Sequence, residues 1–265
     1  MIELPLMKYI PMNTEYTLPE KVSFIITHIG TDDTAQVEVL VDNKPVAYIS
    51  NIVAPLDPTD DNLLGPLSLG DYYIVVPEET KIKCVGTSGK YVSLRGKILI
   101  HDPGERLPEP YMSRFRGQYN SYWKYWENTY SHGTDVAWAA DSEKEVLEIK
   151  PGGAEEFILF GPIMVSGSGG TITYKNFSLV EYLDGKRVEY LWQDDIGPGI
   201  DIMALPRPPT QNNWNRYDYG KEGLKLTFGH KIEYYIRNIS GSDLSPASGN
   251  EWKFTVTVPG VYIKI

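Results

Sequence analysis

Cysteine and histidine are both scarce in this sequence. The 265 residues include one cysteine and four histidines. A single cysteine excludes an intrachain disulfide framework and a cysteine-rich metal site. Cys84 lies in a largely apolar run at residues 82–85 and is expected to be buried and inert. The histidines lack His-x-His or His-x-x-x-His spacing, so no metal-binding or catalytic role is expected for His28, His101, His132 and His230.

Positive charge and long apolar segments are also limited. The chain carries 25 Lys and Arg residues against 35 Asp and Glu residues, a formal net charge of −10. Such a surface repels phosphate backbones, so nucleic acid is not expected as a partner. No segment approaches the ~20 apolar residues that span a bilayer, and residues 1–8 lack the basic start and apolar stretch of a signal peptide. We therefore expect a soluble protein made in a cytoplasm, without membrane contact.

The motifs of common enzyme classes are missing as well. Segments 86–90 and 166–170 come close to the Gly-x-Ser-x-Gly turn of serine hydrolases, but each lacks one required glycine. Gly89-Lys90 does not match a phosphate-binding loop, because Tyr91 follows where a hydroxyl residue should bind magnesium. Both segments are interpreted as hairpin turns. The sequence thus predicts neither an enzyme nor a cofactor.

Two loops are rich in acidic residues. One contains Asp57, Asp60 and Asp61, and the other contains Asp194 and Asp195. Calcium binds through about 6–8 oxygen ligands, but neither loop has the spacing of an EF-hand. We interpret both as solvated loops, with a structural calcium ion at Asp57, Asp60 and Asp61 as the weaker alternative.

Aromatic residues, glycine and proline are abundant. Aromatic residues make up 12% of the chain, and 24 Gly and 19 Pro interrupt it every few residues. Aromatic side chains favour strands, whereas Gly and Pro favour turns. The composition therefore predicts an all-β fold.

Two parts of the chain repeat the same order of signals. The order is a short apolar run, a Gly-Thr pair and a hairpin. It occurs first at Val22–Ile26, Gly30-Thr31 and 37–46, and again at Phe157–Phe160, Gly170-Thr171 and 177–188. Two copies of one β domain explain this repeat most simply.

We predict two tandem jelly-roll-like β-sandwich domains, about 1–104 and 145–265. The turn signals divide each part into short strands, as in a sandwich. A jelly roll is favoured over an immunoglobulin-like sandwich because long loops follow each hairpin and no Cys…Trp…Cys spacing is present. One large sandwich is the alternative.

The linker between the domains, residues 105–144, is predicted to contain one amphipathic helix at about 111–130. Aromatic residues recur there at the period of one helix face, namely Tyr111, Phe115, Tyr119, Tyr122, Trp126 and Tyr130. This stripe is expected to pack on its own chain, with a neighbouring subunit as the alternative partner. A membrane surface is disfavoured, because interfacial helices carry a dense basic face that this segment lacks.

The arrangement of the whole chain resembles the double jelly-roll capsid and vertex proteins of tailless icosahedral viruses. The resemblance is architectural and rests on the paired segments Phe24–Ile26 with Val37–Val46 and Phe157–Leu159 with Phe177–Val188. It implies a non-enzymatic structural subunit that is made in the host cytoplasm and located in the virion. The partners it implies are other copies of this chain and other virion proteins.

A carbohydrate-binding or adhesive β-sandwich protein is the alternative function. Such proteins stack Trp and Tyr rings on the apolar faces of sugars. The candidate contacts lie on or near predicted loops, at Trp192, Trp214, Tyr217 and Tyr219.

Overall fold

The regular secondary structure of the described residues is almost all β-strand, as the composition predicts. The computed structural model describes residues 1–56, 65–103, 105, 107, 111–117, 120–170, 172–188, 200–201 and 218–265. The helical elements with defined bounds are two short 3-10 turns, η1 (Gly70–Tyr72) and η3 (Tyr174–Asn176). No helix in the described part of the chain has the length and apolar character needed to cross a membrane.

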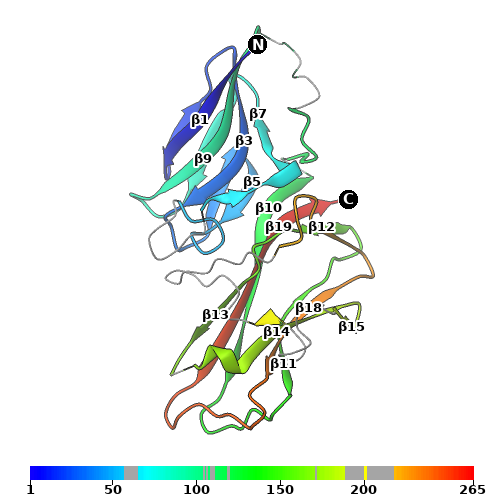
Figure 1. Ribbon diagram of the computed structural model, residues 1–265. Coiled ribbons are helices and arrows are strands. Elements are labelled where there is room, and N and C mark those ends of the chain that lie inside the picture. Colours follow the sequence, from blue (N-terminus) through cyan, green and yellow to red (C-terminus); the bar gives the residue numbers. More distant parts are fainter. Residues whose placement is uncertain are drawn as a thin grey trace.

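The described residues form three sheets, whose arrangement can be followed in Figure 1. The first contains, in spatial order, β1 (Ile2–Pro11), β9 (Tyr91–Ile100), β3 (Val22–Thr31) and β6 (Leu67–Ser68), and β7 (Ile74–Val76) also pairs with β3. The second is a large nine-stranded sheet with the order β17 (Leu224–Thr227), β12 (Glu155–Leu159), β19 (Trp252–Lys264), β10 (Ser121–His132), β5 (Lys44–Ile49), β4 (Val37–Val41), β8 (Lys81–Val85) and β2 (Glu15–Thr17), and β13 (Met164–Ser168) pairs with β19. The third contains β11 (Glu143–Ile149), β18 (Ile232–Asn238), β14 (Phe177–Leu183) and β15 (Lys186–Arg187), and β16 (Ile200–Asp201) pairs with β14.

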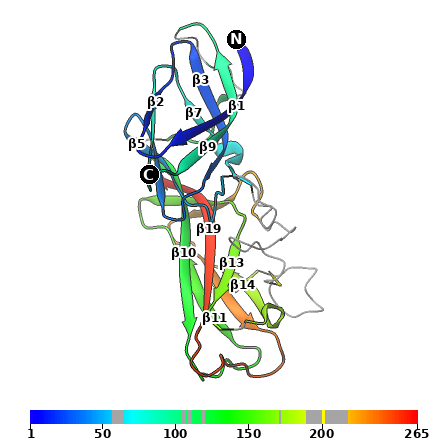
Figure 2. The ribbon, with the colours of Figure 1, turned by 90° about the vertical axis from the view of Figure 1, so that its left-hand side faces the viewer.

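These sheets form two β-sandwiches that lie end to end (Figures 1 and 2). The first sheet packs on the β2-β8-β4-β5 part of the large sheet, and the third sheet packs on its β10-β19-β12-β17 part. Strand residues alternate accordingly; in β4, Val37, Val39 and Val41 face the first core while Glu38 and Leu40 are only half-buried. This alternation fixes the register, because a shift by one residue would expose the apolar set.

The strand order is the same in both halves of the molecule. The first half has β1-β9-β3-β6 facing β2-β8-β4-β5, and the second has β10-β19-β12-β17 facing β11-β18-β14-β15. The segments that repeat in the sequence occupy matching places, since Val22–Ile26 and Phe157–Leu159 fall in β3 and β12, and the two hairpins form β4-β5 and β14-β15. The domain limits at about 104 and 145 stay a prediction.

The predicted linker helix is wrong. Ser121–His132 form the twelve-residue strand β10, and residues 112–117 are irregular. Tyr122, Trp126 and Tyr130 are each four residues apart, a spacing that places side chains on one face of a strand as well as of a helix. The spacing alone therefore could not separate the two structures. Tyr119 lies outside the described residues.

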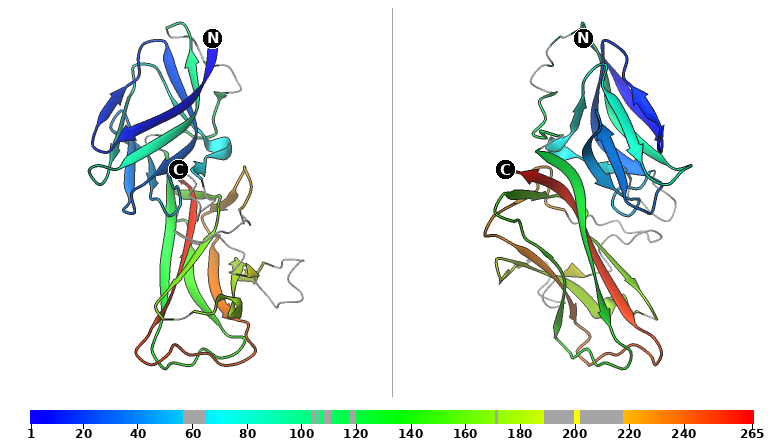
Figure 3. Two further views of the ribbon diagram at one scale, coloured as in Figure 1. Left: turned by 60° about the vertical axis from the view of Figure 1, so that its left-hand side comes forward. Right: turned by 180° about the vertical axis from the view of Figure 1, so that it is seen from behind.

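Strand β10 joins the two sandwiches and contributes side chains to both cores. The fully buried Trp123 points into the first core, where its indole N–H donates to the Tyr72 carbonyl at 3.0 Å and its ring centroid lies 5.0 Å from that of Phe160. Trp126 points to the opposite face and packs on Phe157, with ring centroids 4.9 Å apart. The sandwiches thus occupy opposite faces of one continuous sheet, whose β10 and β5 meet in parallel at Trp123 and Ala47. The other views show β10 and β19 running from this junction through the second sandwich (Figure 3).

Candidate functional site

The predicted aromatic stripe is divided among three places. Tyr111 packs on the outer face of the first sheet with Ile25 and Leu99, and Phe115 belongs to the first core. Tyr122, Trp126 and Tyr130 follow one face of β10, where Trp126 and Tyr130 pack against the second core. Among the described residues of this stripe, Tyr122 lies at the junction between the two sandwiches.

Three tyrosines lie side by side at this junction, and we call them the tyrosine row. Tyr48 of β5, Tyr122 of β10 and Tyr262 of β19 come from three adjacent strands. Tyr122 stacks on Tyr262, with ring centroids 4.8 Å apart, and meets Tyr48 edge to face at 5.2 Å. Such aromatic pairs stabilise by about 0.5–1.5 kcal/mol beyond their burial. The row is therefore a rigid surface whose ring orientations are fixed by neighbours.

Two carboxylates hold the ends of the row. The Tyr48 hydroxyl donates to Glu38 at 2.9 Å, and the Tyr262 hydroxyl donates to Glu155 at 2.9 Å. Burial, together with these carboxylates, raises the pKa of both tyrosines to about 12. At neutral pH both phenols are consequently neutral donors.

Lys124 lies next to the row, on the same face of β10 as Tyr122. Its ammonium is 4.9 Å from the centroid of Trp126 and 5.9 Å from that of Tyr262. Burial lowers the pKa of Lys124, while the charge of Glu155 opposes this shift. Lys124 makes no hydrogen bond or ion pair with residues that the structure describes, and Glu155 is already bonded to the Gly152 N–H and the Tyr262 hydroxyl. The three N–H donors of Lys124 are thus available at the surface of the junction.

A cavity of about 290 Å³ opens beside these groups. It is lined by Gln36, Tyr48, Tyr122, Lys124 and Tyr125. Ligand pockets start at about 300 Å³, so this cavity is near the lower end of their range. No sequence signal connects its walls, because Tyr48 and Tyr122 are far apart in the chain and meet only through the pairing of β5 with β10.

The other candidate residues lie elsewhere. Trp192, Trp214 and Tyr217, and the calcium candidates Asp57, Asp60 and Asp61, fall outside the described residues. The Tyr219 hydroxyl lies 2.7 Å from that of Tyr234, a buried residue of the second core. Among the residues with defined placement, no three His, Cys, Asp or Glu side chains come together as a metal site would require.

One serine and histidine pair resembles part of a hydrolase site. The Oγ of Ser23 lies 2.8 Å from Nε2 of His101, and Nδ1 of His101 lies 2.8 Å from the backbone carbonyl of Asp102. Ser23 is only 2% exposed, so a substrate cannot reach its hydroxyl. The pair instead fixes the chain where it leaves β9.

The burial expected for Cys84 is confirmed, and desolvation raises its thiol pKa to about 12.

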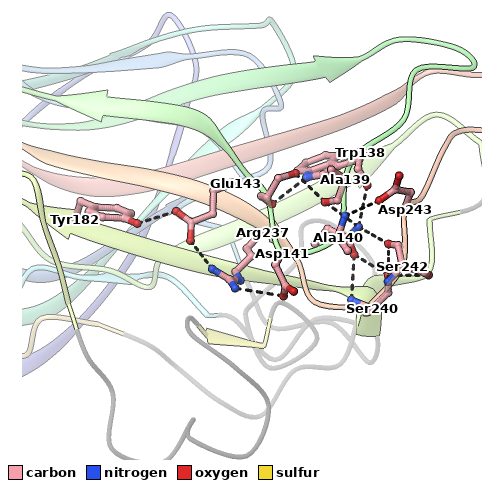
Figure 4. A network of polar contacts seen from close by, with 12 residues as sticks. Trp138, Ala139, Ala140, Asp141, Glu143, Tyr182, Arg237, Ser240, Ser242 and Asp243 are labelled. Carbon is pink, nitrogen blue, oxygen red and sulfur yellow. Dashed lines mark hydrogen bonds and ion pairs between the residues drawn. The ribbon is translucent and has the colours of Figure 1, made fainter.

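A polar network stabilises the far end of the second sandwich (Figure 4). The Arg237 guanidinium pairs with Glu143 at 2.9 Å and with Asp141 at 3.3 Å, and the Tyr182 hydroxyl donates to Glu143. Next to this network, the side-chain amide of the fully buried Asn238 donates hydrogen bonds to the backbone carbonyls of Trp138 and Ser242. These hydrogen bonds and ion pairs connect β11, β14 and β18, which indicates a structural role.

Comparison with models of known protein families and with curated protein sequences finds no match to this chain.

Proposed function

We propose that this chain is a non-enzymatic structural subunit of a virus particle, built as two tandem jelly rolls. The supporting observation is the strand order. A jelly roll has two four-stranded sheets in which the first strand pairs with the eighth, the eighth with the third, and the third with the sixth, facing the order second, seventh, fourth, fifth. The orders β1-β9-β3-β6 and β2-β8-β4-β5 follow this pattern when β6 and β7 share the sixth position.

The second half follows the same pattern. There β10, β19, β12 and β17 take the positions first, eighth, third and sixth, and β11, β18, β14 and β15 take the positions second, seventh, fourth and fifth. Jelly rolls occur in viral capsids, lectins and cupins, so the single fold does not decide the function. Two copies in one chain, joined rigidly by a common sheet, favour the capsid or vertex class over the others.

The outer edge of β1 offers a surface for assembly. This ten-residue strand pairs only with β9 among the described residues, and its exposed apolar side chains are Ile2, Leu4, Met7 and Tyr9. Exposed apolar edges of this length are usually covered by a partner. We therefore expect contact with another copy of the chain, or with another virion protein, at this edge.

Size-exclusion chromatography and electron microscopy of the purified protein test the proposal. A structural subunit forms defined symmetric oligomers, and the chain is found in purified virus particles by mass spectrometry. A Leu4→Glu/Met7→Glu double variant should reduce assembly without unfolding the protein, because both side chains are solvent-exposed.

Phe228→Glu is the matched control, since Phe228 is 69% exposed and lies in the second sandwich after β17. It should leave assembly unchanged. A strictly monomeric protein that is absent from particles would overturn the proposal. The genes beside this one give an independent test, because packaging-ATPase or other virion genes are expected there.

A further inference from the structure

We draw no further inference here: the strongest candidate, the exposed apolar patch of Ile2, Leu4, Met7 and Tyr9 along the outer edge of β1, belongs to the assembly surface already described, and nothing in the structure shows which partner covers it.

Discussion

The two halves of the molecule share a strand order but differ in what fills them. The first core is mainly aliphatic, with Ile, Val and Leu contributed by both of its sheets. The second is centred on rings, and Trp138 contacts those of His132, Phe177 and Phe254 at centroid distances of 4.9, 5.2 and 5.6 Å. The same arrangement of strands is thus compatible with two kinds of packing, which indicates that alternation of inward side chains, rather than their identity, specifies the order.

Removing the central ring of the second core should give the largest effect. Trp138→Ala deletes a fully buried side chain whose indole N–H donates to the Ser142 carbonyl. Such truncations cost about 3–5 kcal/mol, whereas Ile26→Val in the first core should cost about 0.5–1.5 kcal/mol. Urea denaturation followed by circular dichroism measures both. A loss below 1 kcal/mol for Trp138→Ala would show that the ring cluster does not support the second half.

The next effect concerns the buried amide that closes the second sandwich. The Asn238 amide donates to the carbonyls of Trp138 at 2.9 Å and Ser242 at 2.8 Å. Asn238→Ala removes these hydrogen bonds together with those that its Oδ1 accepts from Ser240, and should lower the unfolding free energy by about 1–3 kcal/mol. Asn128→Ala removes one bond at an exposed position and serves as the control. Equal losses in the two variants would argue against the network drawn in Figure 4.

In the first half, the ionisable side chain of Asp33 accepts hydrogen bonds that stabilise the fold, so the stability of this half should depend on pH. Asp33 is buried, and although desolvation opposes ionisation, hydrogen bonds from Thr87 and Ala35 lower its pKa below the ordinary value of 3.8. A lowered pKa stabilises the folded state above the unfolded-state value, and this contribution is lost as the pH falls below about 4.

Denaturation midpoints of the wild type and Asp33→Asn between pH 2 and 7, run in parallel, measure this contribution. The difference between the two proteins should be greatest at neutral pH and shrink towards pH 2. A constant difference would mean that Asp33 is not the titrating group.

The smallest expected effect concerns the reactivity of the Cys84 thiol towards a labelling reagent. Cys84 is fully buried and its thiol pKa is raised to about 12, so a maleimide should not modify the native protein at pH 7.5. Complete modification is expected in denaturant. Rapid labelling of the native protein would show that the first sandwich opens locally around β8.

The sequence predicted the β class and the paired segments because both depend on local patterns. Alternation in Val37–Val41 and the turn in the 177–188 hairpin are visible without tertiary information. The helix prediction failed at β10 because a spacing of four fits both structures. The signal that could have separated them is the nearly continuous aromatic run Tyr122–Trp126, which is typical of a strand with apolar contacts on both faces.

The junction cavity was not predictable from the sequence. Tyr48 and Lys124 belong to strands that are adjacent only because β5 meets β10 across the two halves. Ser23 and His101 likewise meet through the first sheet, although they are far apart in the chain. Contacts between distant segments depend on strand order, which one sequence does not reveal.

The most direct test of this account is whether the two halves unfold as one unit. They share the nine-stranded sheet, and Trp123 of the second half is buried in the first core. Differential scanning calorimetry should therefore show one transition, with equal calorimetric and van't Hoff enthalpies. Trp123→Ala should separate it into two. Two independent transitions in the wild type would contradict the claim that one continuous sheet and the burial of Trp123 in the first core join the sandwiches.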